Sequence, residues 1–340
     1  MRTFRTVAFG ATLLALLVGA CSSGGSSPSP SAASAPPATS APSAPAAESP
    51  SAPAGPALST TLKLGGPPEC PDRPFCLLGL NETYGLEFAE FVPLDAGGPL
   101  TVTALTGGQV DVGLLFTSDP AIATNNFVLL EDDKQLQLAD NIVPVVRQEI
   151  LDANPAVADI LNTVIERLTQ EELTNLNKAV TVDARAAAEV ATEWITAQNF
   201  DASSAGLEGD IVVGSTNFYE QEILGEIFAQ MLEGNGATVE RKFQLGNREI
   251  VFPALEAGEI DALAEYAATA LEFVNGGAGQ ATTDPVATTE ALRTALEPKG
   301  LAALNPAAAT DQNGFVVSKA TADKYGLTKM SDLANPAPAP

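Results

Sequence analysis

The sequence predicts an α/β protein built from two related lobes. Short apolar strands alternate with amphipathic helices along most of the chain, which is typical of this fold class. One unit occurs twice, since "ALTGGQVDVGLLF" at 104–116 parallels "ALEAGEIDALAEY" at 254–266. Each copy is a helix end, a glycine turn and an apolar strand opened by Asp111 or Asp261. Helix–glycine–strand is also a generic α/β connection, but one copy in each half favours two lobes of related architecture.

Residues 1–20 are expected to be a signal peptide rather than part of the fold. Arg2 and Arg5 precede the apolar run "VAFGATLLALLVGA", which is too short to span a bilayer as a mature helix. The run ends in "VGAC", which resembles a bacterial lipobox and predicts cleavage before Cys21 and lipidation of its thiol. The alternative is an ordinary secretory signal followed by a chance cysteine.

Residues 21–58 predict the lipidated cysteine and a disordered stalk. They are almost entirely Ser, Pro, Ala and Gly, with too few apolar side chains to offset the entropy of ordering. The folded part is therefore expected to cover about 59–335, enough for two lobes with cores of their own.

Within the folded part, "IVVGS" at 211–215 is expected to form a short apolar strand, and further strands are expected near 62–65, 111–116, 142–146, 239–244, 260–265 and 314–317. Asp284 and Pro285 are a helix start, and Thr169 with Glu172 forms a capping box. The last helix is expected to begin at Ser331 or Asp332, and no strand follows it.

Composition excludes several functions. The chain has 17 Lys and Arg against 42 Asp and Glu, a formal net charge of −25, so nucleic acid is not an expected partner. It has no histidine, the commonest general base and metal ligand, and we expect neither a metal nor a cofactor. Cys70 and Cys76 in "ECPDRPFC" are expected to form a disulfide in an exported protein, because this loop offers too few ligands for zinc.

Several longer segments resemble one family. They are "VVGSTNFYEQEILGEIFAQMLE", "LGNREIVFPALEAGEID", "EYAATAL", "LGGPPECPDRPFCLLGL", "VDVGLLFTSDPAI" and "LEDDKQLQLADNIVPVVR". They are similar to the osmoprotectant-binding proteins of ABC importers, which bind glycine betaine, choline or proline betaine. The resemblance implies a two-lobed, type II periplasmic-binding-protein-like fold with a hinge and an interlobe cleft. It also implies a non-enzymatic receptor, lipid-anchored through Cys21 at the outer face of the cell membrane, that delivers a small cationic or zwitterionic solute to a permease and ATPase.

The segments stand in a different order from the family's, which predicts a circular permutation. The strand expected after Leu333 is "TLKLGG" at 61–66, and the family's first part follows its second. This order predicts one lobe from 59–141 plus 315–335 (lobe II), the other from 148–310 (lobe I), and hinge strands at 142–147 and 308–314. A fragment of a tandem array and a rearranged sequence are the rival explanations.

The resemblance also implies a ligand site. Tyr266 matches an aromatic-cage tyrosine that would face a quaternary ammonium, Thr269 a hydroxyl on the ligand carboxylate, and Arg73 a carboxylate-binding arginine. The family's other cage tyrosines fall near Phe116, Asn313 and Asp140 or Asn141, while Thr216 replaces a lysine and Tyr219 a threonine. A full tyrosine cage is thus excluded, and a larger or more polar cation or zwitterion than betaine fits this set as well.

Plainer roles exist for the same residues. Tyr266 could cover a strand end, Phe116 could belong to a core and Arg73 could pair with an acid. The competing functions are a sensory solute-binding module and an extracellular hydrolase using carboxylates such as Asp119 and Glu265. No nucleophile motif supports the hydrolase.

Overall fold

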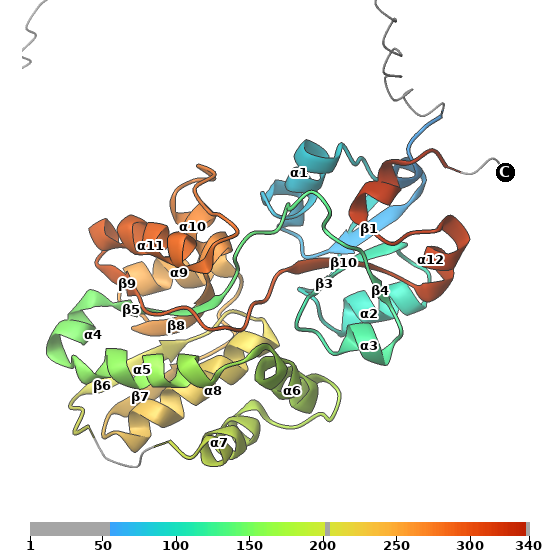
Figure 1. The fold of residues 1–340 in the computed structure, drawn as a ribbon. Helices are drawn as coiled ribbons and strands as arrows, with labels where there is room; N and C mark the ends of the chain where they lie inside the picture. The colour runs from blue at the N-terminus through green and yellow to red at the C-terminus, as the bar shows by residue number, and fades with distance from the viewer. Residues whose placement is uncertain (1–54, 201–204, 338–340) are drawn as a thin grey trace, which may run out of the picture. The chain divides into compact units, whose positions relative to one another are not determined.

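Two five-stranded sheets form the framework of the computed structural model, which describes residues 55–200 and 205–337 (Figure 1). The first sheet has the strand order β2-β1-β3-β10-β4 and the second β7-β6-β8-β5-β9. The strands of the first sheet are β1 (Lys63–Gly66), β2 (Glu90–Pro93), β3 (Val112–Phe116), β4 (Val128–Leu129) and β10 (Asn313–Val317). Those of the second are β5 (Ile142–Arg147), β6 (Asp210–Gly214), β7 (Thr238–Lys242), β8 (Ala262–Tyr266) and β9 (Leu301–Ala303).

The two sheets have the same topology. In each sheet, the first three strands of the order are parallel to one another. The fourth strand is antiparallel to both of its neighbours, the third and the fifth. The fourth strand, β10 or β5, enters from the half of the chain that builds the other sheet, so the chain crosses between the sheets twice. The crossing segments meet at an isolated bridge between Asn141 and Thr310.

Helices cover both sheets. Short helical segments surround the first sheet: η1 (Leu58–Thr61), η2 (Cys70–Asp72), α1 (Leu77–Gly79), η3 (Leu80–Tyr84), α2 (Pro99–Thr106), α3 (Ala121–Thr124), α12 (Lys319–Tyr325) and η5 (Met330–Ala334). Longer ones accompany the second: α4 (Gln148–Ala153), α5 (Ala156–Arg167), α6 (Gln170–Thr181), α7 (Ala187–Gln198), α8 (Tyr219–Gly234), α9 (Arg248–Glu256), α10 (Ala267–Val274), α11 (Pro285–Leu296) and η4 (Glu297–Lys299).

Alternation along β5 divides the second sheet's core into two layers. Ile142 and Val146 are buried with side chains of α5, α6, α7 and α8, whereas Val143 and Val145 are buried with those of α9, α10 and α11. Figure 1 shows these two groups of helices on opposite faces of the sheet. Because both faces are covered, β5 and β8 carry continuous apolar runs at 142–146 and 262–264 rather than alternating with polar residues, as expected of a sheet buried on both sides.

The repeated sequence unit forms the same structure in both halves. α2 leads into β3 and α9 into β8, through turns in which Gly108 (φ 65°) and Gly258 (φ 74°) take the left-handed conformation that glycine tolerates best. The aspartate that precedes each strand also accepts a backbone hydrogen bond from the neighbouring strand of the sheet. Asp111 Oδ2 accepts the Lys63 N–H of β1 at 2.9 Å, and Asp261 Oδ2 accepts the Val212 N–H of β6 at 2.8 Å. Residues 150 positions apart in these two units are therefore structurally equivalent.

The two ends of the described chain are joined by backbone hydrogen bonds. The Leu58 N–H donates to Asn335 O at 2.8 Å, and the Ala337 N–H donates to Pro56 O at 3.1 Å. An isolated bridge between Ala57 and Pro336 lies at the same place, and Figure 1 shows η5 beside the start of the described chain. The segment that ends abruptly in the sequence thus lies next to the one that begins with β1.

The predicted fold class is confirmed, and all seven expected strands are present to within two residues. The sequence prediction did not include β2, β4 and β9, which have four, two and three residues and are too short to give a clear pattern. The last helix, η5, begins at Met330, slightly before the expected Ser331 or Asp332. The predicted signal peptide, Cys21 and the stalk up to residue 54 lie outside the described residues. The lobe and hinge boundaries and the permuted order stay predictions.

Candidate functional site

A cavity of about 520 Å³ is lined by residues that belong to both sheets and their loops. Ligand-binding cavities of proteins are commonly of this size, with apolar walls and a few placed polar groups. Six of the eight predicted ligand-binding residues lie in its lining: Arg73, Phe116, Thr216, Tyr266, Thr269 and Asn313. The structure thus brings together residues that are up to 240 positions apart in the sequence.

The other two predicted residues, Asn141 and Tyr219, are not in the lining. Asn141 is buried, and its side-chain amide donates to Ala307 O at 2.9 Å within the crossing segments. Tyr219 packs edge-on against Phe218, with ring centroids 4.6 Å apart, and so supports the lining from behind.

Aromatic rings form one wall of the cavity. Phe218 lies between Phe116 and Tyr266, with centroid separations of 4.4 and 6.4 Å, and all three line the cavity. Phe75 and Phe273 add two more rings to the lining. Sequence reasoning missed Phe218 although it is part of the "GSTNFYEQ" segment, because a phenylalanine in front of a helix is ordinarily a packing residue.

Tyr266 is fixed by a buried carboxylate. Its hydroxyl donates to Glu220 Oε1 at 2.8 Å, and Glu220 Oε2 accepts the Ser118 hydroxyl at 2.7 Å and a proton of the Asn177 amide. Glu220 is fully buried, and burial raises the pKa of its carboxyl above the ordinary value. This network fixes the orientation of the Tyr266 ring, because the Tyr266 hydroxyl is bonded to Glu220 in the first turn of α8.

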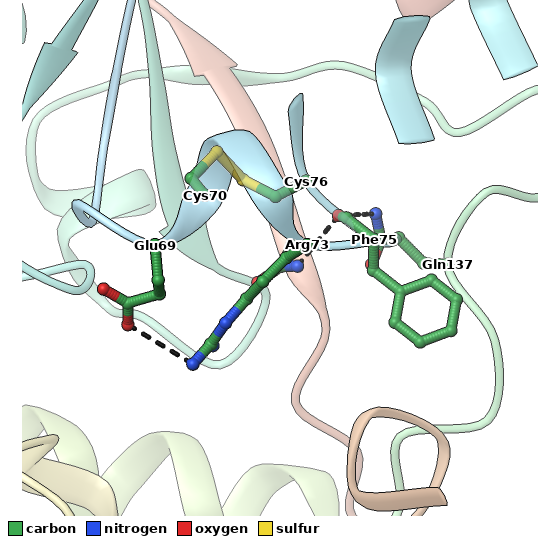
Figure 2. Close-up of a disulfide and its surroundings, with 7 residues drawn as sticks. Glu69, Cys70, Arg73, Phe75, Cys76 and Gln137 are labelled. Carbon is green, nitrogen blue, oxygen red and sulfur yellow. Dashed lines mark hydrogen bonds and ion pairs between the residues drawn. A yellow bond between two sulfur atoms is a disulfide. The ribbon is translucent and has the colours of Figure 1, made fainter. Parts of the chain in front are cut away.

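Arg73 projects from a loop closed by the predicted disulfide, which the structure contains (Figure 2). Cys70 and Cys76 are bonded with their Cα atoms 5.2 Å apart. Nη2 of Arg73 donates to both carboxylate oxygens of Glu249 of α9, at 2.9 and 3.0 Å, and Glu69 Oε1 lies 3.4 Å from the same nitrogen. The predicted ligand arginine is therefore already paired with acidic side chains.

Asn313 also has a protein partner. Its amide donates to the Phe75 carbonyl at 2.9 Å, which the Gln137 amide also contacts at 2.9 Å. This shared carbonyl fixes the end of the disulfide loop against β10, so Asn313 positions Phe75 in the lining.

Thr269 belongs to a second buried network, around Arg248. The Arg248 guanidinium contacts both carboxylate oxygens of Glu265, at 2.7 to 3.0 Å, and donates to the Thr269 hydroxyl at 2.9 Å. The Thr269 N–H donates to Asp140 Oδ1 at 2.8 Å. Glu265, one of the two carboxylates considered for hydrolysis, is thus a structural ion-pair partner. The other, Asp119, accepts the Ala121 N–H at 2.7 Å, and burial raises its pKa to about 6.

Two aspartates from the crossing segments line the cavity side by side. The Asp311 N–H donates to Asp140 O at 3.0 Å, and both side chains are at least 96% buried. Asp311 Oδ1 accepts the Ser118 N–H at 3.0 Å, whereas its Oδ2 is buried without a hydrogen-bond partner among the described residues. Burial raises the pKa of Asp140 to about 7, and burial together with nearby Glu220 raises that of Asp311 well above its usual range.

Within residues 55–200 and 205–337, no group of three or more His, Cys, Asp and Glu side chains is arranged to hold a metal ion. None of the described helices is long and apolar enough to cross a membrane.

A family model described as the substrate binding domain of ABC-type glycine betaine transport systems matches residues 43–197 and 209–340. A glycine-betaine-binding protein of Pseudomonas aeruginosa is 34% identical over 145 residues, 42% of this chain and 46% of its own. The carnitine transport binding protein OpuCC of Listeria monocytogenes is 29% identical over 120 residues, 35% of this chain and 38% of its own. This chain therefore spans less than half the length of these relatives.

Solved structures with similar folds include apo YehZ from Escherichia coli, at 13% identity and a TM-score of 0.35 over 80% of this chain and 84% of that one. An ancestral arginine-binding protein bound to arginine has 15% identity and a TM-score of 0.38, over 82% of this chain and 90% of that one. Identities this low give no information about the ligand.

Proposed function

The chain belongs to the substrate-binding domains of ABC-type glycine betaine transport systems, a family of solute binders and not of enzymes. We therefore propose that it captures a small quaternary-ammonium or zwitterionic osmoprotectant. The observation that carries the proposal is the aromatic wall of the cavity, where Phe218 joins the predicted residues Phe116 and Tyr266. A quaternary ammonium donates no hydrogen bonds and is held by the faces of aromatic rings.

The lining supplies ring faces from both halves of the chain. Phe116 ends β3 of the first sheet, and Tyr266 ends β8 of the second. A ligand that contacts both would stabilise the two sheets in this relative arrangement, since it gains both contacts only when they are close. Capture of the solute would thus favour one conformation for delivery to a permease and its ATPase.

The test is a thermal-shift screen of choline, glycine betaine, proline betaine and carnitine, followed by titration calorimetry of each compound that raises the melting temperature. We expect at least one quaternary ammonium compound to bind, because ligands that bind only the folded state stabilise it. If none of them binds, the proposal is wrong.

We also propose that the protein works outside the cytoplasmic membrane, anchored through Cys21. The lipobox-like "VGAC" and the Ser, Pro and Ala-rich stretch after it support this. Stable anchoring takes two lipid chains, which a diacylglyceryl group supplies. Cys21→Ala should release the protein from the membrane fraction, and full retention would contradict the anchor.

Two observations support the permuted chain order. One is the pair of hydrogen bonds that joins residues 56–58 to 335–337, because the permuted order expects these two segments to be neighbours. The family model also matches as two segments, and the relatives align over less than half of their length, as a permuted chain would. A rearranged chain that begins near residue 209 and joins 337 to 56 should therefore fold and bind the same ligands.

A further inference from the structure

We propose that the cavity selects a ligand of net positive charge whose polar end donates a hydrogen bond, and that Asp311 is the acceptor that determines this specificity. The inference rests on the proposed function, because it assumes that the aromatic wall holds the cationic head. It would make a carboxylate-bearing zwitterion the poorer ligand.

The first observation is the unused bonding capacity of Asp311. Its side chain lines the cavity and is 96% buried, and Oδ1 accepts the Ser118 N–H at 3.0 Å. In the part of the chain that the structure describes, Oδ2 has no hydrogen-bond partner, although a buried acceptor left unsatisfied costs free energy. A donor on the ligand would satisfy it.

The second observation is the charge around the two aspartates. Asp140 lies near the Arg248 guanidinium, which lowers its pKa against the effect of burial. Burial and the carboxylates of Glu220 and Asp140 raise the pKa of Asp311, whereas hydrogen bonds from Ser118 lower it. The two arginines of the lining are paired with Glu249 and Glu265, and in the described part of the chain Asp311 is in no ion pair, so a cationic ligand would supply a positive partner.

The third observation is that the lining leaves no arginine for a ligand carboxylate. Arg73 is paired with Glu249 and Glu69, and Arg248 with Glu265 and Thr269. These two are the cationic residues of the lining, against seven acids: Glu69, Asp72, Glu82, Asp140, Glu249, Glu272 and Asp311. Such a lining attracts cations and opposes a carboxylate once Asp140 and Asp311 are ionised, and a bound cation favours their ionised forms.

Three related compounds separate the contributions. Choline carries a trimethylammonium head and a hydroxyl donor, tetramethylammonium has the charge without the donor, and glycine betaine has a carboxylate in place of choline's hydroxymethyl group. Titration calorimetry of the wild-type protein should show choline binding about tenfold or more tightly than either of the others, the effect of a hydrogen bond to a charged acceptor.

The variant Asp311→Asn should remove the preference. We expect the ratio of choline to glycine betaine affinity to fall by about tenfold, and choline and tetramethylammonium to come within about threefold of each other. The ligand-free melting temperature should not fall, because the variant removes a buried carboxylate that faces Glu220. Asp159→Asn, the same change at an exposed site on α5, is the control and should keep the wild-type ratio.

Two results would overturn the inference while leaving the proposed function intact. One is glycine betaine binding the wild-type protein as tightly as choline, and the other is an unchanged affinity ratio in Asp311→Asn. Failure of all three compounds to bind the wild-type protein would overturn the proposed function itself, and this inference with it.

Discussion

Asp140 and Asp311 occupy equivalent positions in the two halves of the chain, but their surroundings differ. Each stands two residues before the strand that crosses into the other sheet, and each accepts a backbone N–H from the segment after β8 or β3. Asp140 lies near Arg248, whereas Asp311 lies near Glu220. The two halves share one topology, but the aspartate of one half lies near a positive side chain and that of the other near a negative one. This difference bears on the charge of the ligand.

The same comparison explains the aromatic wall. Phe116 and Tyr266 are equivalent, and each pairs with the first residue of its crossing strand, Asn313 or Ile142. The Tyr266 hydroxyl is needed because it donates to the buried Glu220. In the described residues no buried carboxylate needs a donor from position 116, so a phenylalanine ring suffices there.

The largest expected effect comes from the ion pair that only one half contains. Arg248 and Glu265 are buried together, while the equivalent positions in the other half are Gly98 and Leu115. Arg248→Met should lower the free energy of unfolding by about 3–5 kcal/mol, because it leaves Glu265 buried without its counter-ion. Urea denaturation measures this.

The control for this prediction removes both charges. Arg248→Met combined with Glu265→Leu should recover most of the lost stability, since replacing a whole buried pair with apolar side chains is often close to neutral. If Arg248→Met alone were as stable as the wild type, the buried ion pair would not be a difference in stability between the two halves.

The next effect concerns the equivalent rings. Tyr266→Ala should weaken choline binding by roughly thirtyfold, the equivalent of about 2 kcal/mol for a desolvated cation–π contact. Phe116→Ala should cost less, because Phe116 is only partly buried. Titration calorimetry on both variants tests this order, and equal affinity of Tyr266→Ala and the wild type would exclude Tyr266 from the site.

Tyr266→Phe separates the ring from its hydroxyl. The ring face remains, so choline affinity should change by less than about threefold. The free energy of unfolding should fall by about 1–3 kcal/mol, because Glu220 loses a donor. Loss of affinity without loss of stability would assign the hydroxyl to the ligand instead.

The paired aspartates predict a pH dependence. Burial raises the pKa of Asp140 to about 7 and that of Asp311 well above its usual range, although Arg248 opposes the shift at Asp140. Glu265 and Glu220 also face them and raise their pKa values. A bound cation favours the ionised carboxylates, so choline affinity should rise with pH, by about tenfold from pH 6 to 8 if one proton with a pKa near 7 is displaced.

Calorimetry in buffers of different ionisation enthalpy measures the protons released. Without ligand the sign is reversed, because carboxyls of raised pKa bind protons more tightly folded than unfolded. Their contribution to stability should therefore decrease as the pH rises from about 4 through 7. Choline affinity that is independent of pH would show that neither aspartate ionises on binding.

The smallest effect is expected for the ion pair between Arg73 and Glu249. Both side chains are partly exposed, at 31% and 42%, and solvent screens such pairs. A double-mutant cycle with Arg73→Met and Glu249→Gln should give a coupling of less than about 1 kcal/mol in the free energy of unfolding. A much larger coupling would make this pair a principal tie between the two sheets.

Much of the framework follows from the sequence. The repeated helix–turn–strand unit predicts two related halves, and the disulfide follows from two nearby cysteines in a chain with a predicted export signal. The positions of Tyr266, Thr269 and Arg73 in the cavity match the residues that the family resemblance selects.

The charge arrangement of the site could not be predicted in the same way. Asp311 lies in a segment expected only to act as a hinge. Whether its Oδ2 finds a partner among the described residues depends on where Ser118 and Glu220 pack. The engagement of Arg73 by Glu249, 176 residues away, likewise depends on how the disulfide loop and α9 meet. Pairings of this kind have no local sequence signal.

A crystal structure with choline bound would show whether Asp311, rather than the equivalent Asp140, receives the ligand. We predict the hydroxyl within about 3 Å of the Asp311 carboxylate. The trimethylammonium group should lie against Tyr266, Phe218 and Phe116. A hydroxyl bound to Asp140 or Arg73 instead, or choline bound outside this cavity, would contradict the account.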